Sequence, residues 1–362
     1  MAMYCESSQS GNNSVIIVGD SPADILAALR LYQYNNILPT IYEIRTEPTT
    51  LGGVIGIPSN GSGLFRRLRL WDALRARGVE TSTLSVHAVK GHVISEMDIT
   101  SWSWKKTGFE YLRTWRIDRM EVLCQEAHNA GVIIHHRKRL RGIEEDEEGI
   151  SVSDGTRDRA DLLLNCDGIH SMYAYWFFSR EVRIPAEGDT KWESEWGRTL
   201  REVVKLTQVL KFCPVFRLPL GGNWSKERCL IIGDATHAIQ PHASQEVSMV
   251  LEYIFLLSQM LATHPHSLSA VFRVYEEKRR ARVDEMHKAA ERNGNVLKKD
   301  RSLGLWLKEL VTSRDLGIYD LFALDKLGLG QKAMAYNIEE DILRYSKDAG
   351  HFVGYRFSIK SF

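Results

Sequence analysis

Two histidines and a glutamate in the second half of the chain have the types and spacing needed for proton transfer. His237 and His242 flank a turn, and Glu246 follows shortly after it. A histidine within hydrogen-bond distance of a carboxylate is the minimal arrangement for general acid–base chemistry. We therefore predict His237, His242 and Glu246 as catalytic residues, with Glu246 and His237 as the pair to test first. The alternative is that Glu246 only caps the helix that follows.

Proton transfer at such a site supports reactions without a change of oxidation state, such as cyclisation, isomerisation, dehydration or retro-aldol cleavage. Other chemistries find less support. No group of His, Cys and Asp residues has the spacing of metal ligands, so we expect no metal. No serine stands in the turn of a nucleophile elbow, so the sequence offers no catalytic triad.

The first strand, turn and helix position a second set of residues. Val15-Ile16-Ile17-Val18 predicts a buried strand, Gly19 a turn, and residues 25–31 a helix. Glu43 follows the next predicted strand, residues 40–42, where dinucleotide-binding folds carry an acid that binds ribose. This is the layout of a dinucleotide-binding turn that keeps only its first glycine.

Ser21 and Asp24 stand where that turn has its second and third glycines. With Pro22 between them they predict a capping box, in which the helix start satisfies its own N–H groups. A carboxylate about 4 Å from a phosphate charge costs on the order of 4 kcal/mol at an effective dielectric of 20. Asp20 adds a further negative charge. The turn is biased against a dinucleotide, and the alternative that the ligand binds through other contacts stays open.

Composition narrows the class of protein. The 362 residues are 44% hydrophobic and 26% charged with a formal net charge of +1, typical of a globular protein without a nucleic-acid partner. Five cysteines without a C-x-x-C pair favour a reducing compartment, so we expect a cytoplasmic protein. The apolar run 249–262 contains Glu252 and is too short to span a membrane, so it predicts a buried helix.

Periodicity and turn residues predict the remaining elements. In chain order they are a loop at 51–63, a basic helix at 64–77, short strands within 82–115, a helix at 118–130, a strand at 132–134, a hairpin over 141–153, a strand at 161–165, a helix at 193–206, and C-terminal helices at 303–312, 319–327 and 338–346.

Three further segments resemble motifs of a known family. Residues 160–171 contain Asp167-Gly168, residues 228–241 contain Gly233-Asp234 after an apolar strand, and residues 275–282 form a basic stretch. With the opening turn, their order and spacing resemble the single-component FAD-dependent monooxygenases, the aromatic hydroxylases of the para-hydroxybenzoate hydroxylase type. The resemblance extends from residue 15 to about residue 292.

This resemblance implies an α/β fold: a Rossmann-like FAD-binding domain (a ββα sandwich), a reduced β-sheet substrate domain and a C-terminal helical segment. Only 62 positions separate Ser171 from Gly233, which leaves room for a small sheet. The implied boundaries are a disordered tail at 1–14, a discontinuous FAD-binding-like domain at 15–81, 115–171 and 225–294, a reduced substrate domain at 82–114 and 172–224, and C-terminal helices at 295–362.

If FAD is retained, the resemblance also implies its contacts. Glu43 meets the adenosine ribose, Arg116 or Arg119 the ribose-phosphate region, and Asp167 and Asp234 the phosphate and ribityl end. Each has an ordinary alternative, as a strand-end charge, a cap or a surface arginine. The implied cofactor-binding set is Gly19, Glu43, Arg116, Arg119, Asp167, Gly233 and Asp234.

The departures from the family pattern concern the flavin. Where the family has two glycines and an Asn beside the ring, this chain has Ser244-Gln245-Glu246-Val247-Ser248. Glu246 thus puts a carboxylate at the ring edge. Glycine loss at both turns predicts that FAD has been lost and that the site holds no cofactor.

We therefore expect a monooxygenase-like enzyme, a pseudo-oxidoreductase, that performs a non-redox acid–base reaction on a hydrophobic polyketide- or terpenoid-like molecule of secondary metabolism. One alternative is a genuine monooxygenase that uses FAD with NADPH to hydroxylate an aromatic or polyketide substrate. A second alternative is a non-catalytic scaffold that binds a small molecule or a partner protein. The sequence leaves the oligomeric state open.

Overall fold

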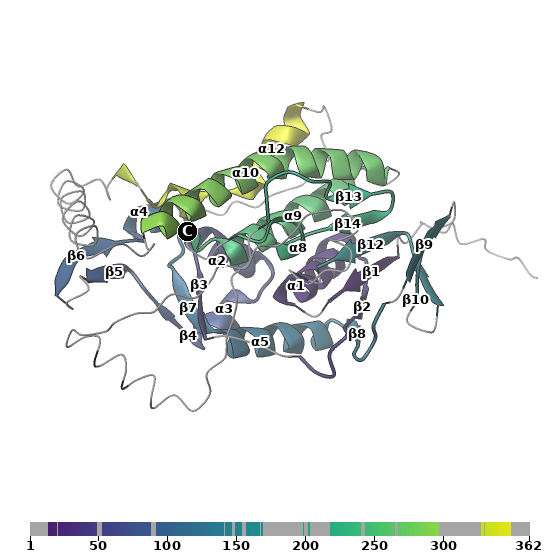
Figure 1. The fold of residues 1–362 in the computed structure, drawn as a ribbon, viewed down its shortest axis with the longest axis horizontal. Coiled ribbons are helices and arrows are strands. Elements are labelled where there is room, and N and C mark those ends of the chain that lie inside the picture. Colours follow the sequence, from purple (N-terminus) through teal and green to yellow (C-terminus); the bar gives the residue numbers. More distant parts are fainter. Residues whose placement is uncertain are drawn as a thin grey trace, which may run out of the picture.

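A six-stranded sheet forms the centre of the computed structural model (Figure 1). Its order is β13-β14-β12-β1-β2-β8, and all neighbours are parallel except β13 and β14. The strands are β13 (Ser225–Lys226), β14 (Cys229–Ile231), β12 (Leu162–Asn165), β1 (Val15–Val18), β2 (Thr40–Tyr42) and β8 (Ile133–His135). The residues described are 14–19, 21–48, 53–87, 92–140, 142–146, 149–153, 157–166, 168, 198, 202, 218–239, 243–264, 267–296, 327–328 and 330–348.

The two faces of the sheet pack against different layers because side chains alternate along each strand. In β1, Val15 and Ile17 join a core shared with helices, whereas Ile16 and Val18 join a core shared with a second sheet. The helices are α1 (Pro22–Arg30), α5 (Arg116–Asn129), α9 (Glu246–Thr263) and α10 (Leu268–Val296). The second sheet is antiparallel and consists of β9 (Gly142–Asp146), β10 (Gly149–Ser153) and β11 (Arg157–Ala160).

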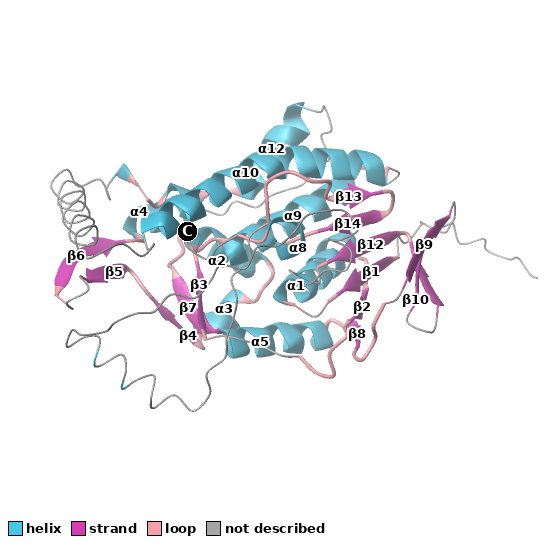
Figure 2. Ribbon diagram, viewed as in Figure 1, coloured by secondary structure: helices cyan, strands magenta, loops and turns pink. Residues whose placement is uncertain are grey.

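These three layers are the Rossmann-like ββα sandwich that the sequence predicts (Figure 2). Helix α9 lies in the middle of the helical layer. It is long and apolar enough to cross a membrane, but 78% of this stretch is buried inside the protein. It is therefore a core helix, as the apolar run 249–262 predicts. Helix α1 continues into a π-helical turn, η1 (Leu31–Asn35), that ends at Asn36 in the left-handed conformation.

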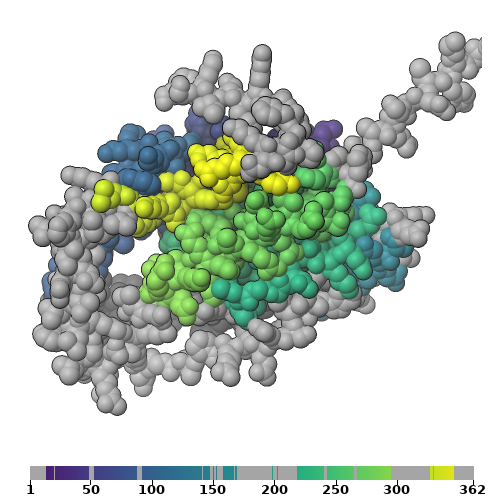
Figure 3. All heavy atoms as spheres, turned by 90° about the horizontal axis from the view of Figure 1, so that it is seen from above, coloured from purple at the N-terminus to yellow at the C-terminus, as the bar shows by residue number. Residues whose placement is uncertain are grey.

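Smaller elements lie at the ends of the helices that are away from the central sheet (Figure 2). They are an antiparallel sheet of β3 (Val54–Ile57), β7 (Leu112–Trp115) and β4 (Gly78–Glu80), a hairpin of β5 (Thr83–His87) and β6 (Val93–Asp98), and helices α3 (Trp71–Arg75) and α4 (Ser101–Thr107). The C-terminal elements η5 (Lys332–Ala335) and α12 (Ile338–Asp348) cross the helical layer and reach α4 (Figure 3).

The prediction of a loop at residues 51–63 is wrong. Strand β3 is followed at once by helix α2 (Ser59–Arg67), which begins five residues before the expected helix and ends ten residues before its expected end. A Cβ atom at Gly61 would lie 2.6 Å from Ser248 Oγ of α9, so small residues allow the two helices to pack closely. This packing outweighs the low helix propensity of the segment.

Helix α4 likewise stands where the sequence predicts strands only, within residues 82–115. The helices expected at 193–206, 303–312 and 319–327 fall almost entirely outside the described residues.

Candidate functional site

A cavity of about 630 Å³ opens at the carboxyl ends of β1, β2, β12 and β14. Strand β1 pairs with β2 on one side and with β12 on the other, so the chain order reverses beside β1. Doubly wound sheets bind ligands at such a switch point. The start of α5, the short helix α8 (Asp234–His237) and the start of α9 complete the wall. The cavity thus lies where the fold places a ligand.

The turn after β1 has the capping box that the sequence predicts. The Ser21 N–H donates to Asp24 Oδ2 at 2.6 Å, and the Ala23 N–H donates to Ser21 Oγ at 3.2 Å. Gly19 has a φ of 121°, and a Cβ there would lie 2.8 Å from Asp24 Oδ2. The Asp24 carboxylate is fully buried at the positive end of α1. The carboxylate therefore caps the start of its own helix.

Glu43 lies at the predicted position, directly after β2, on the cavity wall. Its side chain is buried, and Oε1 accepts a hydrogen bond from the Arg45 N–H at 2.6 Å. Three basic residues that the sequence analysis did not single out, Arg45, Lys138 and Arg139, line the same end. They come shortly after the parallel strands β2 and β8, and this position in the sequence could have identified them as cavity residues.

Arg116 and Arg119 start helix α5 and line the cavity. Arg119 is 5% exposed, and its Nε has no hydrogen-bond partner among the described residues. Burial, together with the charge of Arg116, lowers the pKa of Arg119 to about 9. The described lining contains five cationic side chains and three carboxyl groups (Glu43, Asp234 and Glu246). The cavity therefore favours an anionic ligand.

Asp234 follows β14, on the other side of β1 from β2 and Glu43, and Glu246 lies near enough to Asp234 to respond to its charge. Gly233 precedes Asp234 with a φ of 70°, the conformation that favours glycine. Asp234 is exposed to the cavity but closely surrounded by protein, and this burial raises its pKa while Arg116 opposes the shift. Burial also raises the pKa of Glu246, whose Oε1 is buried without a partner among the described residues. Both groups hold a proton more strongly than an exposed carboxylate does.

His237 also lines the cavity, but it does not pair with Glu246. Both of its ring nitrogens are buried and have no hydrogen-bond partner among the described residues. Its ring packs edge-on against Tyr253, with the centroids 4.9 Å apart. Burial, followed by the charge of Arg279, lowers the pKa of His237 to about 3. The expected proton-transfer pair is therefore absent from this part of the structure.

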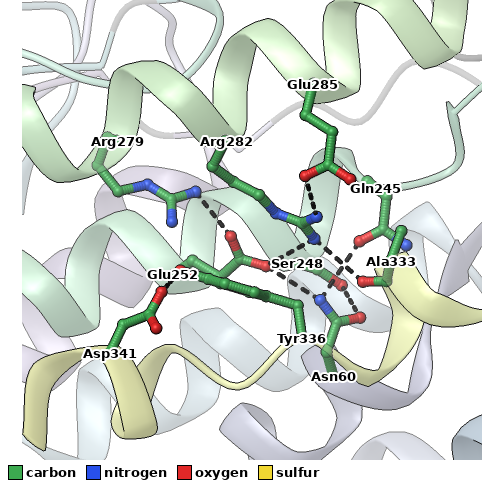
Figure 4. A network of polar contacts seen from close by, with 10 residues as sticks. All are labelled: Asn60, Gln245, Ser248, Glu252, Arg279, Arg282, Glu285, Ala333, Tyr336 and Asp341. Atoms are coloured by element: carbon green, nitrogen blue, oxygen red, sulfur yellow. Dashed lines mark hydrogen bonds and ion pairs between the residues drawn. The ribbon is translucent and has the colours of Figure 1, made fainter. Parts of the chain in front are cut away.

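A buried polar network fixes the start of α9 (Figure 4). The Glu252 carboxylate accepts from Arg279 at 2.6 Å and from Asn60 at 3.0 Å, and it lies 3.5 Å from Arg282. Asn60 also donates to Gln245 Oε1 at 3.3 Å, next to Glu246. Burial is the largest single influence on the pKa of Arg279 and lowers it, but Glu252, Tyr253 and Tyr336 together raise it above the ordinary value.

The same network holds the C-terminal residues. Arg282 donates to the Ala333 carbonyl at 3.0 Å and lies over the ring of Tyr336, 4.3 Å from its centroid. The sequence analysis noted Glu252 only as a charge within the apolar run 249–262 and missed these partners. Two other predicted site residues, Asp167 and His242, and the predicted charge Asp20 lie outside the described residues.

Comparisons with known proteins identify the fold and its usual ligand. Residues 12–217 match the profile of a family described as FAD binding domain. A relative, 6-hydroxynicotinate 3-monooxygenase of Pseudomonas fluorescens, is 23% identical over 361 residues, 79% of this chain and 92% of its own length. The 3-amino-4-hydroxybenzoate 2-monooxygenase PtmB3 of Streptomyces platensis is 21% identical, covering 78% of this chain and 87% of its own.

Solved structures agree on the architecture. The complex of CtdE with FAD and a substrate superposes with a TM-score of 0.68 and 16% identity, covering 79% of this chain and 89% of its own. HpxO of Klebsiella pneumoniae, complexed with FAD and uric acid, has a TM-score of 0.67 and 16% identity, covering 93% and 96%.

The expectation of a site without cofactor is therefore wrong. The matched family is defined by FAD binding, and these structural neighbours contain FAD. The error has a physical reason. The sequence argument predicted the capping box, but it still counted the Asp24 carboxylate as a charge that repels a diphosphate and counted Glu246 as an ionised group at the ring edge. The Asp24 carboxylate is buried and bonded to its own helix start, and burial favours the protonated form of Glu246.

The residues present fit FAD. The cavity has excess positive charge, and the buried Nε of Arg119 has no partner among the described residues, which suits the diphosphate of the cofactor. The match to the family covers more than half of the chain. This protein belongs to the FAD-binding-domain family of the FAD-dependent aromatic monooxygenases.

Proposed function

We propose that the protein is an FAD-dependent monooxygenase that hydroxylates an aromatic small molecule at the expense of NADPH. The observation that carries the proposal is the cavity at the switch point, with Arg119 buried in its wall and without a carboxylate partner among the described residues. A buried cation without a counter-charge is costly, and a bound phosphate offsets that cost. Of the hypotheses drawn from the sequence, this hydroxylase receives more support than the non-redox enzyme.

The chain's own residues have distinct tasks in this proposal. Glu43 binds the adenosine ribose, and Arg116 and Arg119 neutralise the diphosphate. Asp234 and Glu246 face the ribityl and ring end. When bound, FAD supplies the redox chemistry that no side chain can perform, namely reduction by NADPH and activation of dioxygen. Ile239, Val250 and Met286 give the wall an apolar part that excludes water.

His237 does not act as a base in this proposal. Its pKa of about 3 leaves it neutral at working pH, and its position against Tyr253 makes it part of an aromatic core. This weakens the non-redox hypothesis, which depends on a His237–Glu246 pair.

The test starts with the absorbance of the purified full chain, which we expect to show the flavin band at roughly 450 nm that belongs to the cofactor. We then expect NADPH oxidation to accelerate with some members of a panel of hydroxylated aromatic and heteroaromatic acids. Mass spectrometry with isotopically labelled dioxygen should find one labelled oxygen atom in the product. A protein that binds no FAD, or a product without the label, contradicts the proposal.

A further inference from the structure

We propose that Glu246 is a cofactor-facing carboxylic acid that donates a hydrogen bond to the ring end of FAD, so that FAD binding is linked to one proton on this side chain. The inference rests on the proposed function, in which the cavity holds FAD. It makes Glu246 a residue that orients the cofactor and makes its affinity dependent on pH.

The position of Glu246 within the cavity is the first argument. Glu43 marks the adenosine end, because the acid after the second strand of this fold binds the ribose of the nucleotide. Asp234 lines the cavity on the other side of β1 from Glu43, with Glu246 near it, and this is the side left for the flavin part. Glu246 is the first residue of α9, and its Oε1 is buried without a hydrogen-bond partner among the described residues. A buried polar atom of this kind needs a partner, and the ligand can provide it.

The start of α9 is held rigidly, which is the second argument. Gln245, next to Glu246, accepts a hydrogen bond from Asn60, and Ser248 Oγ donates to Asn60 Oδ1 at 3.1 Å. Asn60 is in turn fixed by Glu252, the centre of the network with Arg279 and Arg282 (Figure 4). These hydrogen bonds hold the helix start, and with it Glu246, at the cavity wall.

Electrostatics gives the third argument. The titratable groups that face Glu246 are Asp234 from α8, Arg116 from α5 and Tyr111 from the residues before β7. Burial raises the pKa of Glu246 and Asp234 raises it further, whereas the backbone at the helix start and Arg116 oppose the rise. The direction is upward, and the diphosphate of FAD adds negative charge to the same cavity. The bound state therefore favours the protonated carboxyl.

A protonated carboxyl differs from a carboxylate in having a proton to donate. The flavin ring carries carbonyl oxygens and unprotonated nitrogens that accept hydrogen bonds, and an ionised Glu246 would face them with its own acceptors. We therefore expect FAD affinity to be constant below the pKa of Glu246 in the free protein. Above it, affinity falls by about tenfold per pH unit until the higher pKa of the complex is reached.

The test compares FAD dissociation from the full chain, the Glu246→Gln variant and the Glu277→Gln control over a range of pH. Glu277 is an exposed residue of α10 away from the cavity. FAD-loaded protein is diluted, and the fluorescence of released flavin gives Kd at each pH. We expect wild type and Glu277→Gln to share the same dependence of log Kd on pH. In Glu246→Gln, the slope of log Kd against pH should be smaller by one unit, because one proton fewer is linked to binding. Gln keeps the size and an N–H donor, so its affinity should match that of the wild type at low pH.

Parallel slopes in wild type and Glu246→Gln overturn this inference and leave the proposed function intact. Failure of the wild type to bind FAD at any pH overturns both. A second measurement does not depend on the fold of the variant: infrared spectra of the wild-type FAD complex should contain the carbonyl stretch of a protonated carboxylic acid that disappears at high pH. If Glu246 is ionised throughout the range in which FAD is bound, the inference is wrong.

Discussion

Replacement of Arg119 by methionine should have opposite effects on stability and on FAD binding. The guanidinium is 5% exposed, and burial lowers its pKa from the ordinary value of an arginine to about 9. At about 1.4 kcal/mol per pKa unit, keeping this cation buried costs on the order of 5 kcal/mol in the absence of FAD, and water in the cavity reduces that figure. Buried ionic groups replaced by apolar ones often stabilise proteins by about 1–4 kcal/mol. We expect a gain in this range for FAD-free Arg119→Met.

FAD binding should change in the other direction, because the variant loses a charged hydrogen-bond donor to the diphosphate. Such bonds contribute about 1.5–3 kcal/mol, which corresponds to a Kd raised by roughly 10- to 150-fold. Urea denaturation of the FAD-free protein measures the first effect, and flavin fluorescence titration the second. Arg273→Met, at an exposed position of α10, is the control and should change neither quantity. A destabilised FAD-free variant with unchanged FAD affinity would refute the reasoning.

Three other predictions follow from the buried groups. Glu252→Gln should lower the free energy of unfolding by about 3–5 kcal/mol in urea denaturation, because it leaves Arg279 and Arg282 without their buried counter-charge. The control is Glu285→Gln, which changes a 60% exposed partner of Arg282 and should lower the free energy of unfolding by under about 1 kcal/mol. A loss no larger for Glu252→Gln than for its control contradicts the role of the network. His237 has a pKa of about 3 when folded and an ordinary value of 6.5, so the unfolded chain binds more protons between these values and stability falls as pH drops through that window. His237→Phe should flatten the acid side of a curve of melting temperature against pH, and an unchanged curve counts against a neutral buried imidazole. Gly328→Ala should destabilise the protein by about 1–3 kcal/mol and speed hydrogen exchange in residues 330–348, since φ is 72° and the added methyl meets the Trp102 ring; native-like exchange in this segment contradicts that packing.

The family resemblance implies the architecture, whereas local patterns in the sequence predict its individual elements. The apolar strand Val15–Val18, the capping box of Ser21 and Asp24, and the position of Glu43 after β2 all follow from neighbouring residues, and the structure contains each of them. The failure at α2 has a different origin, since the helix at Gly61 packs closely against Ser248 of a helix distant in the sequence. No periodicity within residues 51–63 contains that information.

The sequence names Glu246 and His237 as candidate site residues, but it does not contain their charge states. Whether a carboxyl or an imidazole carries a proton depends on burial and on neighbours from other elements. Burial and the charge of Asp234 raise the pKa of Glu246, whereas burial and the charge of Arg279 lower the pKa of His237. One available signal was missed. Arg119 precedes Leu123 by four residues, so it shares the buried face of α5 and was a better candidate for a buried cation than for a surface charge.

The C-terminal elements have a consequence for how this protein can be shortened or fused. Gln331 Oε1 accepts hydrogen bonds from the Trp102 and Ser103 N–H groups at the start of α4, and the Ala333 carbonyl oxygen accepts one from Arg282. A deletion that begins at residue 330 would remove the side chain that caps α4 and the carbonyl oxygen that accepts a hydrogen bond from the buried Arg282. Protein engineers who attach a reporter domain should therefore keep residues 330–348 intact.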